Sequence, residues 1–232
     1  MRELWIWHHM GMGDFYTCNG MVRHFAEKYD KIHLFYKDPN KDNVEYLYRD
    51  LKNIDFIDGG VHEDNLAKLW QMTHPGYPLM KIGFDYLTRV AKDKTIYPKP
   101  LFDQLFYKQA GIPISYKWDK FYLERDMKRE KEVYYDILGL KDGEEYIFLH
   151  DHPDYKTKEV PDNIKIIKPT NKEVKIPEFL YTIDKAKEVH LMNSAFLCLV
   201  DAMRLIDHDK MFYHAYIRNI EMQLTPNWKI II

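Results

Sequence analysis

The stretch LWIWHHMGMGDFYTCNGMVRHF, residues 4–25, joins a short apolar run to a helical pattern through a junction rich in glycine and histidine. The run at 4–9 predicts a buried strand, and the apolar spacing that follows predicts a helix over 14–28 with Asp14 as its N-cap. A strand that passes directly into a helix is the beginning of a βα unit. Because two glycines and an aspartate exceed what a structural turn needs, we look for function at this junction first.

The rest of the chain continues the alternation of strands and helices. In the first half we predict a strand at 31–37, a helix at 43–51 and a strand at 54–60; in the second half, strands at 146–151, 164–169, 188–192 and 210–216 with helices at 176–186 and 194–206. This order predicts an α/β fold with two Rossmann-like domains, each built on a parallel sheet with right-handed crossovers.

The segment between the two halves, residues 62–140, is mostly helical in pattern. Its clearest predicted helix covers 126–140 and ends at Gly139. The sequence GLKDGEE then provides the predicted boundary, with an N-terminal domain over 1–140 that includes this helical extension and a C-terminal domain over 141–232.

Composition limits the classes of protein to consider. The chain has 232 residues, of which 46% are hydrophobic and 30% charged, as in ordinary globular proteins. Its 34 basic and 36 acidic residues give a formal charge of −2, so no overall field would attract nucleic acid. Cys18 and Cys198 provide neither a disulfide framework nor a zinc site. With no apolar run of membrane-spanning length, we expect a cytoplasmic protein and leave a peripheral membrane contact open.

In parallel α/β sheets, ligands bind at the carboxyl ends of the strands. At the first junction, Gly11, Met12 and Gly13 let the backbone amides at the start of a helix approach a ligand closely. Asp14 would repel a phosphate and is better suited to act as a general base, with a plain helix cap as the alternative. Tyr16 stands where a dinucleotide-binding G-x-G-x-x-G motif needs its third glycine, so that motif is absent.

A second strand–helix junction lies at Asn193, Ser194 and Ala195. The helix amides and the Ser194 hydroxyl there suit a pyrophosphate, and simple capping of the helix is the alternative. After the predicted last strand, Arg218 is either a phosphate ligand or a surface residue, and His214 lies close to it in sequence.

The loop HDHPDYK at 150–156 leaves three interpretations open. In an extended chain, His150 and His152 lie on the same side, which is compatible with a metal site. The loop could equally line a ligand site or be plain surface. The chain lacks the Walker A, G-x-S-x-G and H-E-x-x-H motifs, which argues against a P-loop kinase, a serine hydrolase of that type and a zinc protease.

The loop GMGD before a helix, together with EVHLMNSAFLCLVDAM at 188–203, resembles glycosyltransferases of the GT-B fold, especially heptosyltransferase-like enzymes whose first loop reads Gly-Leu-Gly-Asp. The resemblance identifies the chain as a small, divergent relative. It implies two domains that face each other across a cleft, with a nucleotide-sugar donor held by the C-terminal half and a carbohydrate or glycan acceptor by the N-terminal half. The family's Asp-Thr-Gly turn falls on Asn193-Ser194-Ala195, which departs from the pattern.

The reaction implied by this resemblance is an inverting, metal-independent transfer that needs no cofactor besides the nucleotide-sugar co-substrate. Asp14 would be the catalytic base, and the helix amides at 194–196 with Arg218 or Lys168 would stabilise the leaving pyrophosphate. Two other functions stay open. One is a non-catalytic module that binds a nucleotide or sugar phosphate, and the other is a metal-dependent hydrolase that uses His150, Asp151 and His152.

Overall fold

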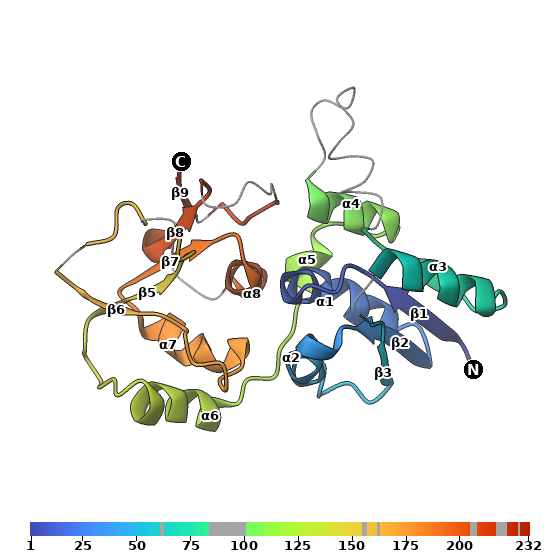
Figure 1. Cartoon of the computed structure of the whole chain (residues 1–232), viewed down its shortest axis with the longest axis horizontal. Coiled ribbons are helices and arrows are strands. Elements are labelled where there is room, and N and C mark those ends of the chain that lie inside the picture. The colour runs from blue at the N-terminus through green and yellow to red at the C-terminus, as the bar shows by residue number, and fades with distance from the viewer. Residues whose placement is uncertain are drawn as a thin grey trace. The chain divides into compact units, whose positions relative to one another are not determined.

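The computed structural model shows an α/β protein that divides into two compact units (Figure 1). It describes residues 1–60, 63–83, 101–154, 157–161, 163–204, 208–216, 222–226 and 228–232. Unit 1 comprises Met1–Glu124 and Glu221–Gln223, and unit 2 comprises Arg125–Ile220 and Leu224–Ile232. Each unit contains one parallel sheet, which confirms the predicted α/β class with two parallel sheets.

The sheet of unit 1 has the strand order β3-β2-β1-β4, and all its neighbours are parallel. The strands are β1 (Glu3–Trp7), β2 (Lys31–Tyr36), β3 (Ile54–Asp58) and β4 (Leu79–Lys81). β4 corrects the prediction of a mostly helical middle segment, because it extends the sheet along β1 with Leu79 beside Trp5. Its three residues are too few to show the alternation that marks a strand in a sequence.

Five helices lie in the described residues of unit 1. They are α1 (Met12–Ala26), α2 (Lys41–Leu47), α3 (Glu63–Thr73), α4 (Phe102–Gln109) and α5 (Tyr116–Asp119), and a 3₁₀ turn (Asp38–Asn40) precedes α2. α1 is almost entirely buried and approaches α5 closely. A Cβ atom on Gly20 would lie 1.9 Å from the backbone oxygen of Tyr116, so only glycine permits this approach.

The sheet of unit 2 has the strand order β6-β5-β7-β8-β9 and is also parallel throughout. The strands are β5 (Tyr146–His150), β6 (Lys165–Ile167), β7 (Glu188–Met192), β8 (Met211–His214) and β9 (Lys229–Ile231). The four predicted strands are present, and β9 is an additional one of three residues. The described helices are α6 (Met127–Glu132), a π-helical turn (Val133–Ile137), α7 (Leu180–Lys185) after a 3₁₀ turn (Ile176–Phe179), and α8 (Ala195–Met203). A further 3₁₀ turn (His208–Lys210) precedes β8.

The single helix predicted over 126–140 is therefore two successive elements. Asp126 caps the first of them, α6, by accepting a hydrogen bond from the backbone N–H of Arg129 at 3.0 Å. The two units divide between Glu124 and Arg125, ahead of the predicted boundary at 140, and α6 groups with unit 2. An ion pair of 3.3 Å between Arg129 and Glu178 ties α6 to the turn before α7.

A buried ion pair holds a short C-terminal segment within unit 1. Lys117 and Asp103 are both fully buried, with 2.9 Å between Nζ and Oδ2. The backbone N–H of Gln223 donates to both carboxylate oxygens of Asp103 at 3.1 Å, and its carbonyl oxygen accepts from Lys117 Nζ. Two residues further on, in unit 2, the backbone N–H and hydroxyl of Thr225 donate to Asp201 at 2.8 and 2.9 Å.

Within the described ranges, no helix combines the length and the hydropathy that crossing a lipid bilayer requires.

Candidate functional sites at the carboxyl ends of the two sheets

The first junction connects the end of β1 at Trp7 to the start of α1 at Met12. Gly11 is the N-cap, with an extended backbone (φ −69°, ψ 147°), so the prediction that Asp14 caps the helix is wrong. Asp14 is the third helical residue, and its backbone N–H donates to the Gly11 carbonyl at 3.0 Å. The extended conformation at Gly11 lets the helix begin two residues earlier than predicted.

The carboxylate of Asp14 folds back over the glycine-rich loop. A Cβ atom at Gly11 would lie only 2.7 Å from Asp14 Oδ2, so the missing side chain of Gly11 makes room for the carboxylate. The first turn of α1 thus carries its own negative charge next to the positive end of the helix dipole. Such a site disfavours a phosphate but can accept a proton from a neutral hydroxyl.

Buried polar contacts fix the loop that leads to Gly11. The fully buried His8 ring bonds through Nδ1 to the carbonyl oxygen of His9 at 2.5 Å. The side-chain amide of Asn40, from the turn before α2, donates to the carbonyl oxygen of Met10 at 2.6 Å. These bonds satisfy backbone groups of the loop and hold Gly11 in place.

The second junction, between β7 and α8, has the opposite electrostatic character. Ser194 is the N-cap of α8 and its backbone is extended, but its hydroxyl makes no capping bond. The Ser194 Oγ is buried and has no hydrogen-bond partner in the described part of the chain. No acid stands in the first turn from Ala195, so the positive end of this helix is uncompensated. The neighbouring Asn193 is buried as well.

His150 lies beside this junction, at the end of β5 and in register with Leu191 of β7. Its ring centroid is 4.8 Å from that of Phe196 in α8. Burial lowers the pKa of His150, and the negative charge of Asp151 opposes this only in part. Its Nδ1 atom is buried and lacks a hydrogen-bond partner among the described residues. His150 and Ser194 thus place two unsatisfied polar groups at neighbouring strand ends, an arrangement that a polar ligand would satisfy.

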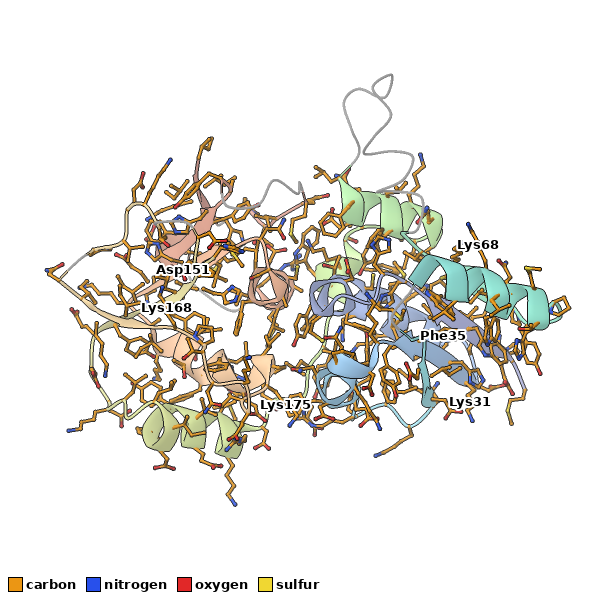
Figure 2. The ribbon with its side chains drawn as sticks, viewed as in Figure 1. Lys31, Phe35, Lys68, Asp151, Lys168 and Lys175 are labelled. Carbon is orange, nitrogen blue, oxygen red and sulfur yellow. The ribbon has the colours of Figure 1, made fainter. Side chains whose placement is uncertain are left out.

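An ion pair organises the loop after His150. Lys168 Nζ lies 3.0 and 2.8 Å from the two carboxylate oxygens of Asp151 (Figure 2), and the Thr157 hydroxyl donates to Asp151 at 2.9 Å. The exposed His152 accepts a hydrogen bond from the backbone N–H of Asp154 at 3.2 Å. Across the described ranges, no three His, Cys, Asp or Glu side chains are grouped so that they could hold a metal ion.

His214, at the end of β8, belongs to a buried chain of hydrogen bonds. The His190 and His214 rings meet with 3.0 Å between Nδ1 and Nε2, and His190 Nε2 lies 3.0 Å from the carboxylate of Glu188. At the other end, Tyr216 bonds to His214 Nδ1 at 3.2 Å, and the backbone N–H of Lys158 donates to the Tyr216 oxygen at 2.8 Å.

Only one direction of proton donation satisfies every member of this chain with neutral rings. Glu188 accepts only, so His190 carries its proton on Nε2 and accepts at Nδ1 from His214 Nε2–H. His214 Nδ1 then accepts from the Tyr216 hydroxyl. Burial lowers the pKa of both histidines, and the neighbouring His190 adds to the effect on His214, whose pKa falls to about 4.

We expect this histidine pair to make the fold sensitive to acid. The native pKa of His214 is below the unfolded value, so the unfolded chain binds more protons between about pH 6.5 and pH 4. The contribution of neutral His214 to the free energy of unfolding is therefore fully present above pH 6.5 and is lost as the pH decreases. At pH 5 the loss from His214 alone is about 2 kcal/mol. The measurement is the unfolding free energy from urea titrations at pH 7 and pH 5.

The control for this prediction is His214→Gln, whose amide can accept from Tyr216 and donate to His190 without titrating. It should reduce the loss of stability between pH 7 and pH 5. An NMR titration of the His214 ring with a midpoint near pH 6.5 would contradict the prediction directly.

The structure brings some of the predicted ligand residues together and leaves others apart. His150, Asn193, Ser194, Ala195 and His214 lie at the ends of adjacent strands β5, β7 and β8 of unit 2. Gly11, Met12, Gly13 and Asp14 form the corresponding junction of unit 1. Lys168 is already paired with Asp151, His152 is exposed, and Arg218 lies outside the described residues.

The sequence analysis missed His190 and its partner Glu188. Both stand inside the β7 pattern EVHLM, which we interpreted as an ordinary strand. Their spacing of two residues puts them on one face of the strand, and a glutamate and a histidine on a face that is otherwise apolar could have indicated a buried polar pair.

Neither the comparison with protein-family models nor the comparison with curated proteins finds a match. Among solved structures, a glycosyl transferase family 9 protein from Veillonella parvula is similar, with a TM-score of 0.60 and 9% sequence identity. The match covers 99% of this chain and 86% of that one. At this identity, the comparison shows that the two chains share a fold.

Proposed function

We propose that this protein is a glycosyltransferase that moves a sugar from a nucleotide-activated donor to a hydroxyl group of an acceptor. The observation that carries the proposal is the contrast between its two strand–helix junctions. One presents a carboxylate in the first turn of α1, and the other presents the acid-free start of α8 with the unpaired Ser194 hydroxyl. The fold shared with a glycosyl transferase family 9 protein supports the same conclusion.

In the proposed reaction, Asp14 accepts the proton of the acceptor hydroxyl. The oxygen attacks the anomeric carbon of the donor sugar from the side opposite the phosphate, and the bond from that carbon to the phosphate oxygen breaks. The electron pair leaves with the nucleoside diphosphate, and the configuration of the sugar is inverted. The absence of a side chain at Gly11 leaves room for the Asp14 carboxylate in this position.

The amides of α8 and the Ser194 hydroxyl would stabilise the charge that develops on the leaving diphosphate. His150, kept neutral by burial, would donate one further hydrogen bond. Lys168 would contribute by exchanging Asp151 for a phosphate oxygen, and Arg218 is proposed as a second cation. The helix end and these cations would supply the electrostatic stabilisation without a metal ion.

Nucleotide binding at α8 can be tested with an acid placed at the start of the helix. Ala195→Glu adds a negative charge next to the amides, so we expect it to weaken binding of the nucleoside diphosphate at least tenfold. The measurement is thermal shift followed by calorimetry with ADP, CDP, GDP and UDP and their sugars. A ligand at 100 times its dissociation constant should stabilise the native protein by about 2.7 kcal/mol.

Met127→Glu is the matched control, because it adds the same charge at the first position of α6 on an exposed side chain. It should leave nucleotide affinity unchanged. The absence of a shift with every nucleotide, or equal effects of the two substitutions, would contradict the assignment of α8.

A non-catalytic binding module is the second candidate function. It is favoured by the sequence Asn193-Ser194-Ala195, in which the resembled family has Asp-Thr-Gly. This candidate predicts the same nucleotide binding and the same effect of Ala195→Glu, but no release of nucleoside diphosphate when donor and acceptors are supplied together.

A further inference from the structure

Unit 1 contains a cavity of about 400 Å³ between α3 and the carboxyl ends of β1, β2 and β3. Trp7 and Phe35 form its floor, and each is only 1% exposed. Leu66, Leu69 and Trp70 of α3 line its wall. Figure 2 shows Phe35 on the sheet and Lys68 on the outer side of α3. The Asp14 junction is not among the described residues that line the cavity.

The described lining offers very few hydrogen bonds. Its polar side-chain groups are Asp58 and Thr73, at the end of β3 and the end of α3, and the indole N–H groups of Trp7 and Trp70. The Thr73 hydroxyl already donates to the backbone oxygen of Leu69 at 2.9 Å, and Asp58 accepts from the backbone N–H of Gly60 at 2.8 Å. The N–H of Gly59 is used by the carbonyl of Tyr36 at 2.7 Å.

This chemistry selects among ligand classes. A sugar ring inside the cavity would give up several hydrogen bonds to water and regain few of them, which is unfavourable. An anion would meet no cation in the described lining and would be repelled by Asp58. A hydrocarbon chain loses no hydrogen bonds and gains by removing its apolar surface from water. The cavity size lies within the range of ordinary small-ligand pockets.

The apolar lining also continues onto the outer surface of α3. Leu69 lines the cavity and is 55% exposed, and Met72, three residues later on the helix surface, is 78% exposed. Tyr77, after the helix, is 50% exposed. Exposed apolar side chains that adjoin an apolar cavity are typical of binding sites.

We propose that this cavity binds the hydrocarbon chain of an uncharged amphiphile, with the polar head of the ligand at the rim beside Asp58. The inference concerns unit 1 alone and goes beyond the proposed transfer reaction, because binding of such a ligand requires neither a donor nor turnover.

Calorimetry with n-octyl β-D-glucoside below its micelle concentration tests the proposal on the full chain. We expect saturable binding of one molecule per chain, and no binding of glucose, which has the same head without the chain. Leu69→Lys puts a charge in the cavity wall and should weaken binding at least tenfold. Thr73→Phe places a large side chain at the rim from an exposed position and should also weaken binding of octyl glucoside at least tenfold.

Met127→Lys, a similar substitution of an exposed apolar residue in unit 2, is the matched control and should leave affinity unchanged. Equal binding of glucose and octyl glucoside would overturn the proposal in favour of sugar recognition. If the protein sedimented with phosphatidylcholine vesicles but showed no saturable binding of octyl glucoside, the proposal would be overturned in favour of adsorption to a lipid surface. Equal effects of Leu69→Lys and Met127→Lys would exclude this cavity as the site.

Discussion

Replacing Asp14 by Asn is expected to lower the rate of sugar transfer by about 10²- to 10⁴-fold, the range typical of a general base. The amide of asparagine has nearly the same shape as the carboxylate, so it can occupy the space above Gly11. It cannot accept the proton of an acceptor hydroxyl at neutral pH. The measurement is the initial rate of nucleoside diphosphate release in the presence of donor and acceptor.

Asp42→Asn provides the matched control for Asp14→Asn. Asp42 is an exposed aspartate in the first turn of α2, so its replacement makes the same change of charge near a helix start outside the proposed site. Its transfer rate should equal that of the unmodified chain. Nucleotide affinity should be retained in both variants, and a full transfer rate in Asp14→Asn would show that another group is the base.

Replacing Lys117 by Met is expected to lower the free energy of unfolding of unit 1 by about 3–5 kcal/mol. The substitution leaves the Asp103 carboxylate fully buried without its cation. Its remaining partners among the described residues are the backbone N–H groups of Gln104 and Gln223. Removing one member of a buried pair costs far more than the pair itself contributes, because the remaining charge is desolvated and unpaired. Urea unfolding followed by circular dichroism measures the change.

Two further variants separate this effect from simple loss of packing. The double variant Asp103→Leu with Lys117→Met should recover much of the loss, because neither charge remains in the interior. Lys31→Met breaks an exposed ion pair with Asp55 and should change stability much less. If Lys117→Met destabilised the protein no more than Lys31→Met, the buried pair would not have the role assigned to it.

The sequence predicts the fold where a strand is long enough to show its pattern. β1, β5 and β7 are runs of five residues that are mainly apolar, and each was predicted close to its observed bounds. β4, β6 and β9 have three residues each. β6 was predicted because it lies in the longer apolar run at 164–169, whereas β4 and β9 pair with the edges of β1 and β8. Such pairing depends on neighbours distant in sequence, so no local pattern indicates it.

The candidate sites also have features that the local sequence predicts and features that depend on distant parts of the chain. The Gly11–Asp14 and Asn193–Ala195 junctions could be predicted because a strand followed directly by a helix marks the ligand-binding edge of a parallel sheet. The exact start of α1 could not be predicted, because it is decided by the backbone geometry at Gly11. The bond between His190 and His214 depends on the register of β7 against β8, and the pairing of Lys168 with Asp151 depends on β6 lying beside β5.

The return of Gln223 to Asp103 and Lys117 means that unit 1 is not encoded by one continuous stretch of the chain. A fragment that stops at Glu124 would lack the backbone groups that complete its buried charges. Its complement, from Arg125 to the end, would carry those groups at Gln223. Two such fragments would therefore be partners for reassembly rather than independent proteins, and a minimal version of unit 1 would need residues 221–223 supplied in trans or grafted onto it.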